Sequence, residues 1–87
     1  MAAFVYILQN EDTGKFYIGS TENLERRIKE HQRGIVQSTK GWTHKKVVLA
    51  QEYPDINTAE RIETRLKAFK SRIIVEKIVR DGKIRLD

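Results

Sequence analysis

One segment, residues 4–31, constrains the fold of this chain more than any other. Two short apolar runs, residues 4–8 and 16–19, alternate with a period of two residues, which is typical of strands. The residues between the runs are rich in turn formers, and the second run leads directly into a segment with helical periodicity. We therefore expect a β-hairpin followed immediately by a helix.

The register of the hairpin decides which side chains share a face. If Gln9 pairs with Gly14 across a four-residue loop, Tyr6 lies opposite Tyr17 and the two phenols are neighbours on one face. A slip of one residue would send the two tyrosines to opposite faces. The other face is then entirely apolar and carries Val5, Ile7, Phe16 and Ile18.

The following helix carries a charge within its apolar stripe. Leu24, Ile28 and His31 recur at spacings of four and three residues, and Arg27 lies among them. An arginine in this position must extend to solvent or contact an anion.

A later helix repeats this feature with the opposite sign. Its apolar stripe contains Glu63, one turn from both Ala59 and Leu66, and continues through Ile62 and Phe69. Two interpretations remain open for Arg27 and Glu63: they form an internal ion pair with each other, or they line a site.

The remaining elements follow from turn residues and periodicity. We expect a single domain over residues 1–87, an α+β fold in which three helices flank a three-stranded antiparallel sheet in the order β-β-α-β-α-α. Asp81-Gly82 would also allow a C-terminal hairpin, but the periodicity favours a helix there. The predicted strands are residues 3–9, 15–20 and 45–53, and the helices run from a cap at Ser20 or Thr21 to about Arg33, over about 57–70, and to about Val79.

Composition narrows the possible functions. The 87 residues include no cysteine, which excludes disulfides and thiolate sites, and only two histidines. No apolar run approaches the roughly 20 residues of a membrane span, and the N-terminus is unlike a signal peptide, so we expect a cytoplasmic protein that does not enter membranes. The formal net charge of +5 is compatible with a polyanionic partner and equally with ordinary solubility.

Tyr17-Ile18-Gly19, with Tyr6 eleven residues before Tyr17 and Arg27 ten residues after it, resembles the GIY-YIG nuclease superfamily. The likeness extends over residues 1–80 and is to small single-domain members related to the N-terminal nuclease domain of the bacterial excision-repair endonuclease. The second motif is complete, whereas Phe4 stands where the first motif has its glycine.

The resemblance implies a catalytic role for each of five residues. Tyr17 would position the attacking water and act as general base, Arg27 would hold the scissile phosphate, and Tyr6 would support both. His31 would assist the chemistry, and Glu63 would be the single protein ligand of Mg²⁺ or Mn²⁺.

Taken singly, each of these residues has an ordinary structural explanation. Tyr6 and Tyr17 would be core aromatics with hydrogen-bonded hydroxyls. Arg27 would be a surface arginine, His31 a cation near the C-terminal end of the helix dipole, and Glu63 an ion-pair partner. Their joint occurrence at the family spacing favours the site.

Basic residues near the ends of these elements are candidates for DNA contacts, which would hold phosphates without reading sequence. We therefore expect an endonuclease acting on branched, damaged or single-stranded DNA in repair or processing, with any specificity supplied by further protein partners. A non-catalytic nucleic-acid-binding module and a basic structural domain are the alternatives.

Trp42 would stack on a base or cap the core. The candidate DNA-binding residues are Arg26, Lys29, Lys40, Lys45, Lys46, Lys67, Lys70 and Arg72.

Overall fold

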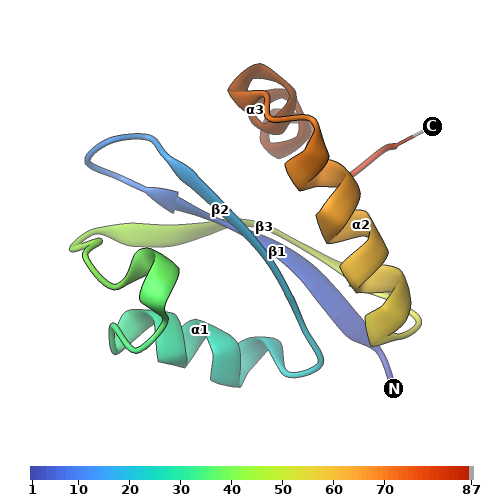
Figure 1. Ribbon diagram of the computed structural model, residues 1–87, viewed down its shortest axis with the longest axis horizontal. Helices are drawn as coiled ribbons and strands as arrows, with labels where there is room; N and C mark the ends of the chain where they lie inside the picture. Colours follow the sequence, from blue (N-terminus) through green and yellow to red (C-terminus); the bar gives the residue numbers. More distant parts are fainter. Residues whose placement is uncertain (87) are drawn as a thin grey trace.

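The alternating and helical segments form the expected elements in the computed structural model, which describes residues 1–86 (Figure 1). The sheet is antiparallel with the strand order β2-β1-β3, so β2 is an edge strand and β1 is central. The α+β fold and the order β-β-α-β-α-α are thereby confirmed. The strands are β1 (Ala3–Asn10), β2 (Phe16–Thr21) and β3 (Lys45–Tyr53); the helices are α1 (Leu24–Gln32), the 3₁₀ turn η1 (Gln37–Thr39), α2 (Ile56–Ala68) and α3 (Arg72–Asp81).

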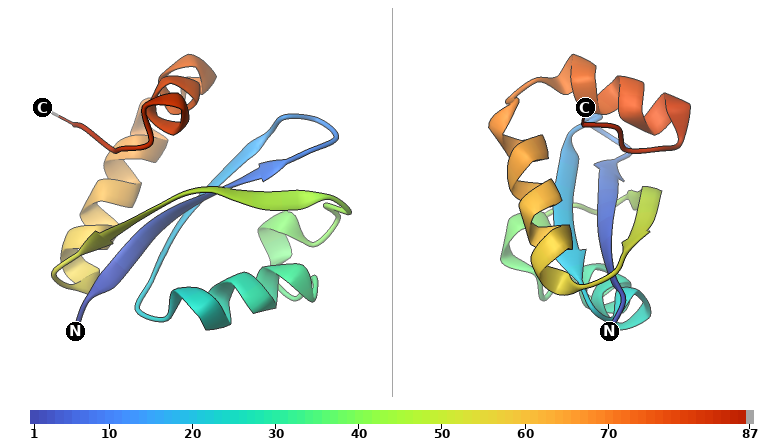
Figure 2. Two further views of the ribbon diagram at one scale, coloured as in Figure 1. Left: turned by 180° about the vertical axis from the view of Figure 1, so that it is seen from behind. Right: turned by 90° about the vertical axis from the view of Figure 1, so that its right-hand side faces the viewer.

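The two faces of the sheet are covered by different helices. On one face, Val5, Ile7 and Ile18 pack with apolar residues of α2 and α3, including Leu66 and Ile78, in the hydrophobic core. On the other face lie α1 and η1, as Figure 2 shows from two further directions. Burying both faces allows β1 to be apolar along nearly its whole length.

The hairpin register differs from the expected one by two residues. Tyr6 pairs with Gly19, and Leu8 pairs with Tyr17. A shift of two residues preserves the face of every side chain, because side chains alternate with a period of two. The two tyrosines therefore share a face as expected, as diagonal rather than directly opposed neighbours, with ring centroids 6.3 Å apart.

The shift arises in the turn, which begins one residue later than expected. The Asn10 amide donates to the Lys15 carbonyl, and the Asn10 side-chain oxygen accepts from the amides of Asp12 and Thr13. Asn10 thus ends the strand and caps its own turn. Gly14 closes the turn at a φ of 79°, a conformation that glycine adopts without strain.

Two further details differ from expectation at the helix ends. The cap of α1 is Asn23, whose side chain accepts from the Arg26 amide, rather than Ser20 or Thr21. Phe69 does not belong to the buried stripe of α2, because that helix ends at Ala68 and the Phe69 side chain is 42% exposed. No helix within residues 1–86 has the length and apolar character needed to cross a membrane.

Candidate functional site

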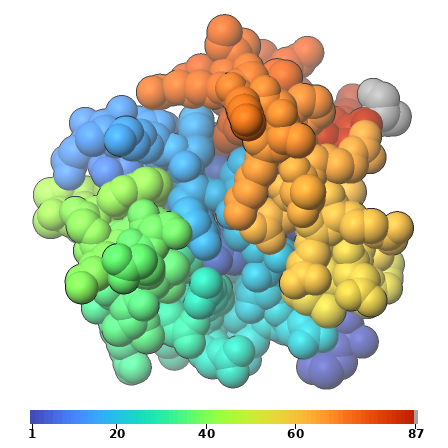
Figure 3. Space-filling model, viewed as in Figure 1, coloured from blue at the N-terminus to red at the C-terminus, as the bar shows by residue number. Residues whose placement is uncertain are grey.

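A furrow runs along the edge strand β2, between the segment of α1 and η1 on one side and α2 on the other. The space-filling view shows it between the green and orange parts of the surface, with blue to cyan chain at its floor (Figure 3). Because side chains of a strand alternate, β2 contributes to both sides of the furrow. Tyr17 faces His31 of α1, with ring centroids 5.1 Å apart, whereas Ser20 bonds Glu63 of α2.

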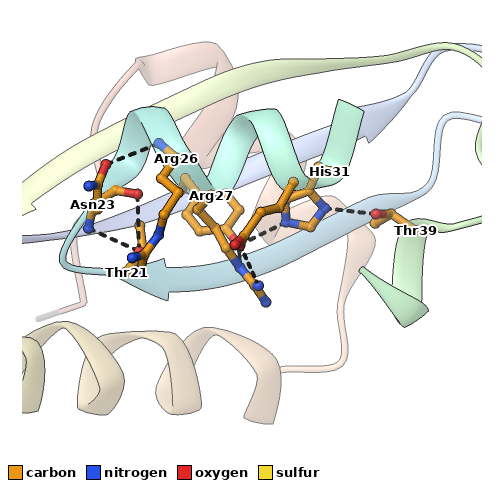
Figure 4. Close-up of polar contacts among 8 residues, drawn as sticks. Thr21, Asn23, Arg26, Arg27, His31 and Thr39 are labelled. Atoms are coloured by element: carbon orange, nitrogen blue, oxygen red, sulfur yellow. Dashed lines mark hydrogen bonds and ion pairs between the residues drawn. The ribbon is translucent and has the colours of Figure 1, made fainter. Parts of the chain in front are cut away.

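A buried polar chain lies on the α1 side (Figure 4). His31 Nε2 is 2.9 Å from the Tyr6 hydroxyl, and His31 Nδ1 is 2.7 Å from the Thr39 hydroxyl. All three side chains are almost completely inaccessible to solvent. Both ring nitrogens are therefore satisfied, which fixes the imidazole in one orientation.

His31 is neutral at physiological pH. Burial, and secondarily the nearby cations of Arg27 and Lys45, lower its pKa from 6.5 to about 4. The interpretation of His31 as a helix-terminal cation is therefore wrong. A neutral imidazole here accepts one hydrogen bond and donates another, so it links the hydroxyls of Tyr6 and Thr39.

The Tyr6 phenol is protonated and held in place. Burial is the main cause that raises its pKa to about 12, although a hydrogen bond from Arg27 opposes this shift. The phenol lies directly over the bare Cα of Gly19, where a Cβ would approach the Tyr6 oxygen to 2.5 Å. Gly19 thus has a steric reason to be glycine, since a side chain would displace the phenol.

Arg27 borders the furrow next to Tyr6. Its Nε donates to the Tyr6 oxygen at 3.3 Å, and its Nη1 pairs with Glu30 at 3.1 Å. Within residues 1–86 its ion-pair partner is Glu30, not Glu63, so the internal pair considered above does not form. The guanidinium retains further N–H groups, and its side chain is 36% exposed.

Glu63 approaches the furrow from α2. One carboxylate oxygen accepts from the Ser20 hydroxyl, and the other pairs with the Lys67 ammonium, both at 2.5 Å. The Lys67 ammonium also lies over the Tyr17 ring, 5.9 Å from its centroid. Glu63 is thus linked to β2 through Ser20, and Lys67 contacts both Glu63 and the Tyr17 ring, even though α1 and α2 cover opposite faces of the sheet.

The donor set suits a divalent metal only in one specific way. Within residues 1–86 no three acidic, histidine or cysteine side chains form a group that could hold an ion. Glu63 is a single carboxylate whose side chain is 18% exposed. It fits a Mg²⁺ ion that keeps several waters and takes further ligands from substrate phosphates, and such an ion must compete with Lys67 for the carboxylate.

The candidate DNA-binding residues are dispersed. Lys67, Lys70 and Arg72 line a pocket beside the furrow, together with Trp42. Lys45 donates to backbone carbonyls of the 34–44 loop. Arg26 and Lys29 border a separate hollow on α1, and Lys40 and Lys46 are exposed elsewhere.

Sequence reasoning did not identify Thr39 or Ser20 as members of the site. Thr39 reaches His31 only because η1 folds back against α1, and nothing in the spacing of the two residues signals this contact. Ser20 had a usable signal, since it follows Gly19 in β2 and alternation places it on the face of α2.

Comparisons with known proteins identify the family of this chain. A family model described as the GIY-YIG catalytic domain matches residues 2–74. A UPF0213 protein of Autographa californica nuclear polyhedrosis virus is 42% identical over 84% of this chain and 76% of its own length. A UPF0213 protein of Nitratidesulfovibrio vulgaris is 37% identical over 74% of this chain and 58% of its own length. The solution structure of a UPF0213 protein from Bacillus halodurans is 35% identical, with a TM-score of 0.58 over 91% of this chain and 83% of that one.

Proposed function

Because this chain belongs to the GIY-YIG catalytic domain family, whose members are nucleases, we propose that it is a divalent-metal-dependent DNA endonuclease. It hydrolyses phosphodiester bonds, selects DNA by structure rather than by sequence, and acts in DNA repair or processing. Contacts from dispersed cations hold phosphates without reading sequence, which supports the lack of sequence preference.

The observation that carries this proposal is that Tyr17 and Arg27 border the furrow from one side and Glu63 from the other, with Tyr6 buried beneath Arg27 as its hydrogen-bond partner. Phosphodiester hydrolysis requires a positioned water, cations around the developing phosphorane charge and a path for a proton. The side chains that border the furrow have these capacities, which supports the proposal.

Each residue has a distinct role in this mechanism. Arg27 binds a non-bridging oxygen of the scissile phosphate, and Tyr6 and Glu30 hold the guanidinium in position. Tyr17 positions the attacking water and acts as general base in its phenolate form: it takes the water's proton as the water oxygen bonds to phosphorus, one ester P–O bond breaks, and the leaving oxygen takes up a proton from solvent. Burial raises the pKa of Tyr6 and keeps the phenol protonated, and the hydrogen-bonded chain of His31 and Thr39 holds it in one orientation.

Glu63 would hold Mg²⁺ or Mn²⁺, and the bound ion would supply Lewis-acid stabilisation of the phosphorane charge. Ser20 orients the Glu63 carboxylate through its hydroxyl. When the carboxylate is engaged elsewhere, Lys67 is free to contact a phosphate of the same strand.

A cleavage panel tests the proposal. Purified protein with Mg²⁺ or Mn²⁺ is expected to cut at least one of a set of flap, loop, nicked and duplex DNAs. Arg27→Ala and Tyr17→Phe are expected to abolish cleavage while most DNA affinity remains, because binding is spread over many cations. Arg61→Ala is the matched control, since Arg61 is exposed in a separate hollow on α2. Full cleavage by Tyr17→Phe would contradict the mechanism.

One observation favours a second candidate, a nucleic-acid-binding module without turnover. Both oxygens of Glu63 already have partners in Ser20 and Lys67, so a metal ion must displace an ammonium. Salt-sensitive DNA binding with no cleavage of any DNA in the panel would establish this alternative.

A further inference from the structure

A pocket of about 340 Å³ lies beside the furrow, where the hairpin turn meets the junction of α2 and α3. Its volume falls within the roughly 300–1,000 Å³ that is usual for small-ligand sites. Its described lining contains four cations, Lys15, Lys67, Lys70 and Arg72, and no carboxylate. Such a lining is complementary to a polyanion.

The pocket also presents aromatic and apolar surface. Phe16 and Trp42 line it, and its floor includes Ile18 and Val75. Aromatic rings with interspersed cations are the means by which proteins hold single nucleic-acid strands, because every base has a face that can stack. Cations alone would serve a phosphate, whereas this lining also suits a base.

Arg72 is held against the aromatic surface. Its guanidinium lies over the Phe16 ring, 6.0 Å from the centroid, and Glu76 pairs with its Nε at 3.5 Å. It also packs over the bare Cα of Gly14, where a Cβ would collide with the guanidinium. The hairpin turn and α3 thus jointly orient Arg72 before any ligand arrives.

Lys70 adopts a conformation that is unusual for its residue type. Its φ of 49° is the only positive value among the non-glycine residues described. Left-handed backbone is unfavourable for a residue with a Cβ, and such residues cluster at functional sites. Glycine would be the natural choice at this junction, and the lysine instead supplies an ammonium to the pocket.

We infer that this pocket binds one unpaired nucleotide of the DNA strand next to the scissile phosphate, with its base against Phe16 and Trp42 and its phosphate on Lys70 and Arg72. The inference rests on the proposed function and extends it. Lys67 lines the pocket and also pairs with Glu63. A DNA strand that crosses the furrow would therefore reach both the pocket and Glu63. A duplex could fill the pocket only by unpairing a base, so the pocket selects flaps, loops and single strands.

The chain carries its own probe, because Trp42 is its only tryptophan. A single-stranded oligonucleotide, added in EDTA so that no cleavage occurs, is expected to quench Trp42 fluorescence. An abasic strand of the same length, which has the same phosphates without bases, is expected to quench little. Binding without any quenching difference between these two strands would overturn the base pocket.

Variants provide a second, independent measurement. Arg72→Gln and Lys70→Gly are each expected to weaken single-strand binding about 5-fold or more, and to weaken binding of the matched duplex much less. Arg80→Gln is the control, since it removes the same charge at the other end of α3. Lys70→Gly is also expected to melt no lower than wild type, because it relieves the backbone strain. Unchanged affinity in both pocket variants would overturn the inference.

The two proposals fail separately. If the wild type cuts no DNA in the metal-containing panel but shows base-dependent quenching, the nuclease proposal fails and the pocket stands. If it cuts DNA without base-dependent quenching, the nuclease proposal stands and the pocket is wrong.

Discussion

His31 illustrates how one buried side chain organises the site. It is almost fully buried between Tyr6 and Thr39 and takes part in two hydrogen bonds of normal length. Leaving a buried polar group unpaired costs about 1–3 kcal/mol, so each of the three side chains helps to keep the others in place. Arg27, which donates to Tyr6, shares this support.

The lowered pKa of His31 predicts a specific dependence of stability on pH. The folded state takes up the proton only near pH 4, whereas the unfolded chain takes it up near 6.5. The stability that comes from keeping His31 neutral is therefore fully present above about pH 6.5 and is lost as pH falls toward 4, by at most about 3–4 kcal/mol. Urea unfolding should show the stability gap between wild type and His31→Gln narrowing over this range. His44→Gln, which removes the other histidine and its exposed pair with Asp12, shows how much of the profile does not come from His31.

Gly19 offers a steric test of the Tyr6 position. Gly19→Ala would bring a methyl group to 2.5 Å from the Tyr6 oxygen, so the phenol must move and lose its contacts with His31 and Arg27. We expect a loss of about 1–3 kcal/mol of unfolding free energy and of cleavage activity. Gly41→Ala is the control, since nothing lies within 4 Å of its added methyl group. Equal stability of the two variants would show that Tyr6 is not confined.

At the scale of elements, α1 and α2 flank the edge strand β2. Each helix directs one charged side chain toward this strand, Arg27 from α1 and Glu63 from α2. Helical periodicity places Arg27 beside Tyr6, and the same periodicity places Glu63 beside Ser20. The local ion pairs within each helix, Arg27–Glu30 and Glu63–Lys67, compensate these charges without joining the two helices. Neither helix depends on the other for charge balance.

This arrangement predicts that Glu63→Gln preserves the fold. Glutamine keeps the oxygen that accepts from Ser20 and loses only the pair with the half-exposed Lys67, which is worth about 0–1 kcal/mol. Thermal melting should therefore change little, while metal-dependent cleavage should be lost. Glu60→Gln, on the exposed side of the same helix, should affect neither property. A Glu63→Gln protein that melts far below wild type would indicate a structural role instead.

At the scale of the whole molecule, the net charge of +5 is arranged unevenly. Four cations gather at the pocket beside the furrow, whereas Arg26 and Lys29 lie on another part of α1. A DNA strand that crosses the furrow would therefore meet most of the favourable electrostatic potential at the end that carries the pocket. Such binding weakens steeply with salt, because each neutralised phosphate releases counterions.

Salt titration measures this distribution. Lys67→Gln is expected to lower DNA affinity and to reduce the slope of log affinity against log salt by about one, the change for a single lost phosphate contact. Lys77→Gln should match wild type, since Lys77 borders a different hollow near the C-terminus. Anisotropy measurements over a range of salt concentrations check the prediction, and identical slopes for both variants would place the DNA elsewhere.

The sequence by itself determined the order of the elements and the direction in which the critical side chains point. Alternation put Tyr6 and Tyr17 on one face, and this result survived a register error of two residues because the period of a strand is two. Helical periodicity likewise turned Arg27, His31 and Glu63 inward.

Tertiary structure alone decided which groups meet. It paired His31 with Thr39, Arg27 with Glu30 rather than Glu63, and Glu63 with Ser20. It also brought Phe16 and Trp42 to one pocket with Arg72. Local periodicity specifies only the face of an element, whereas the contacts of that face depend on how distant segments cross and how loops close, and those arrangements follow from packing the whole chain at once.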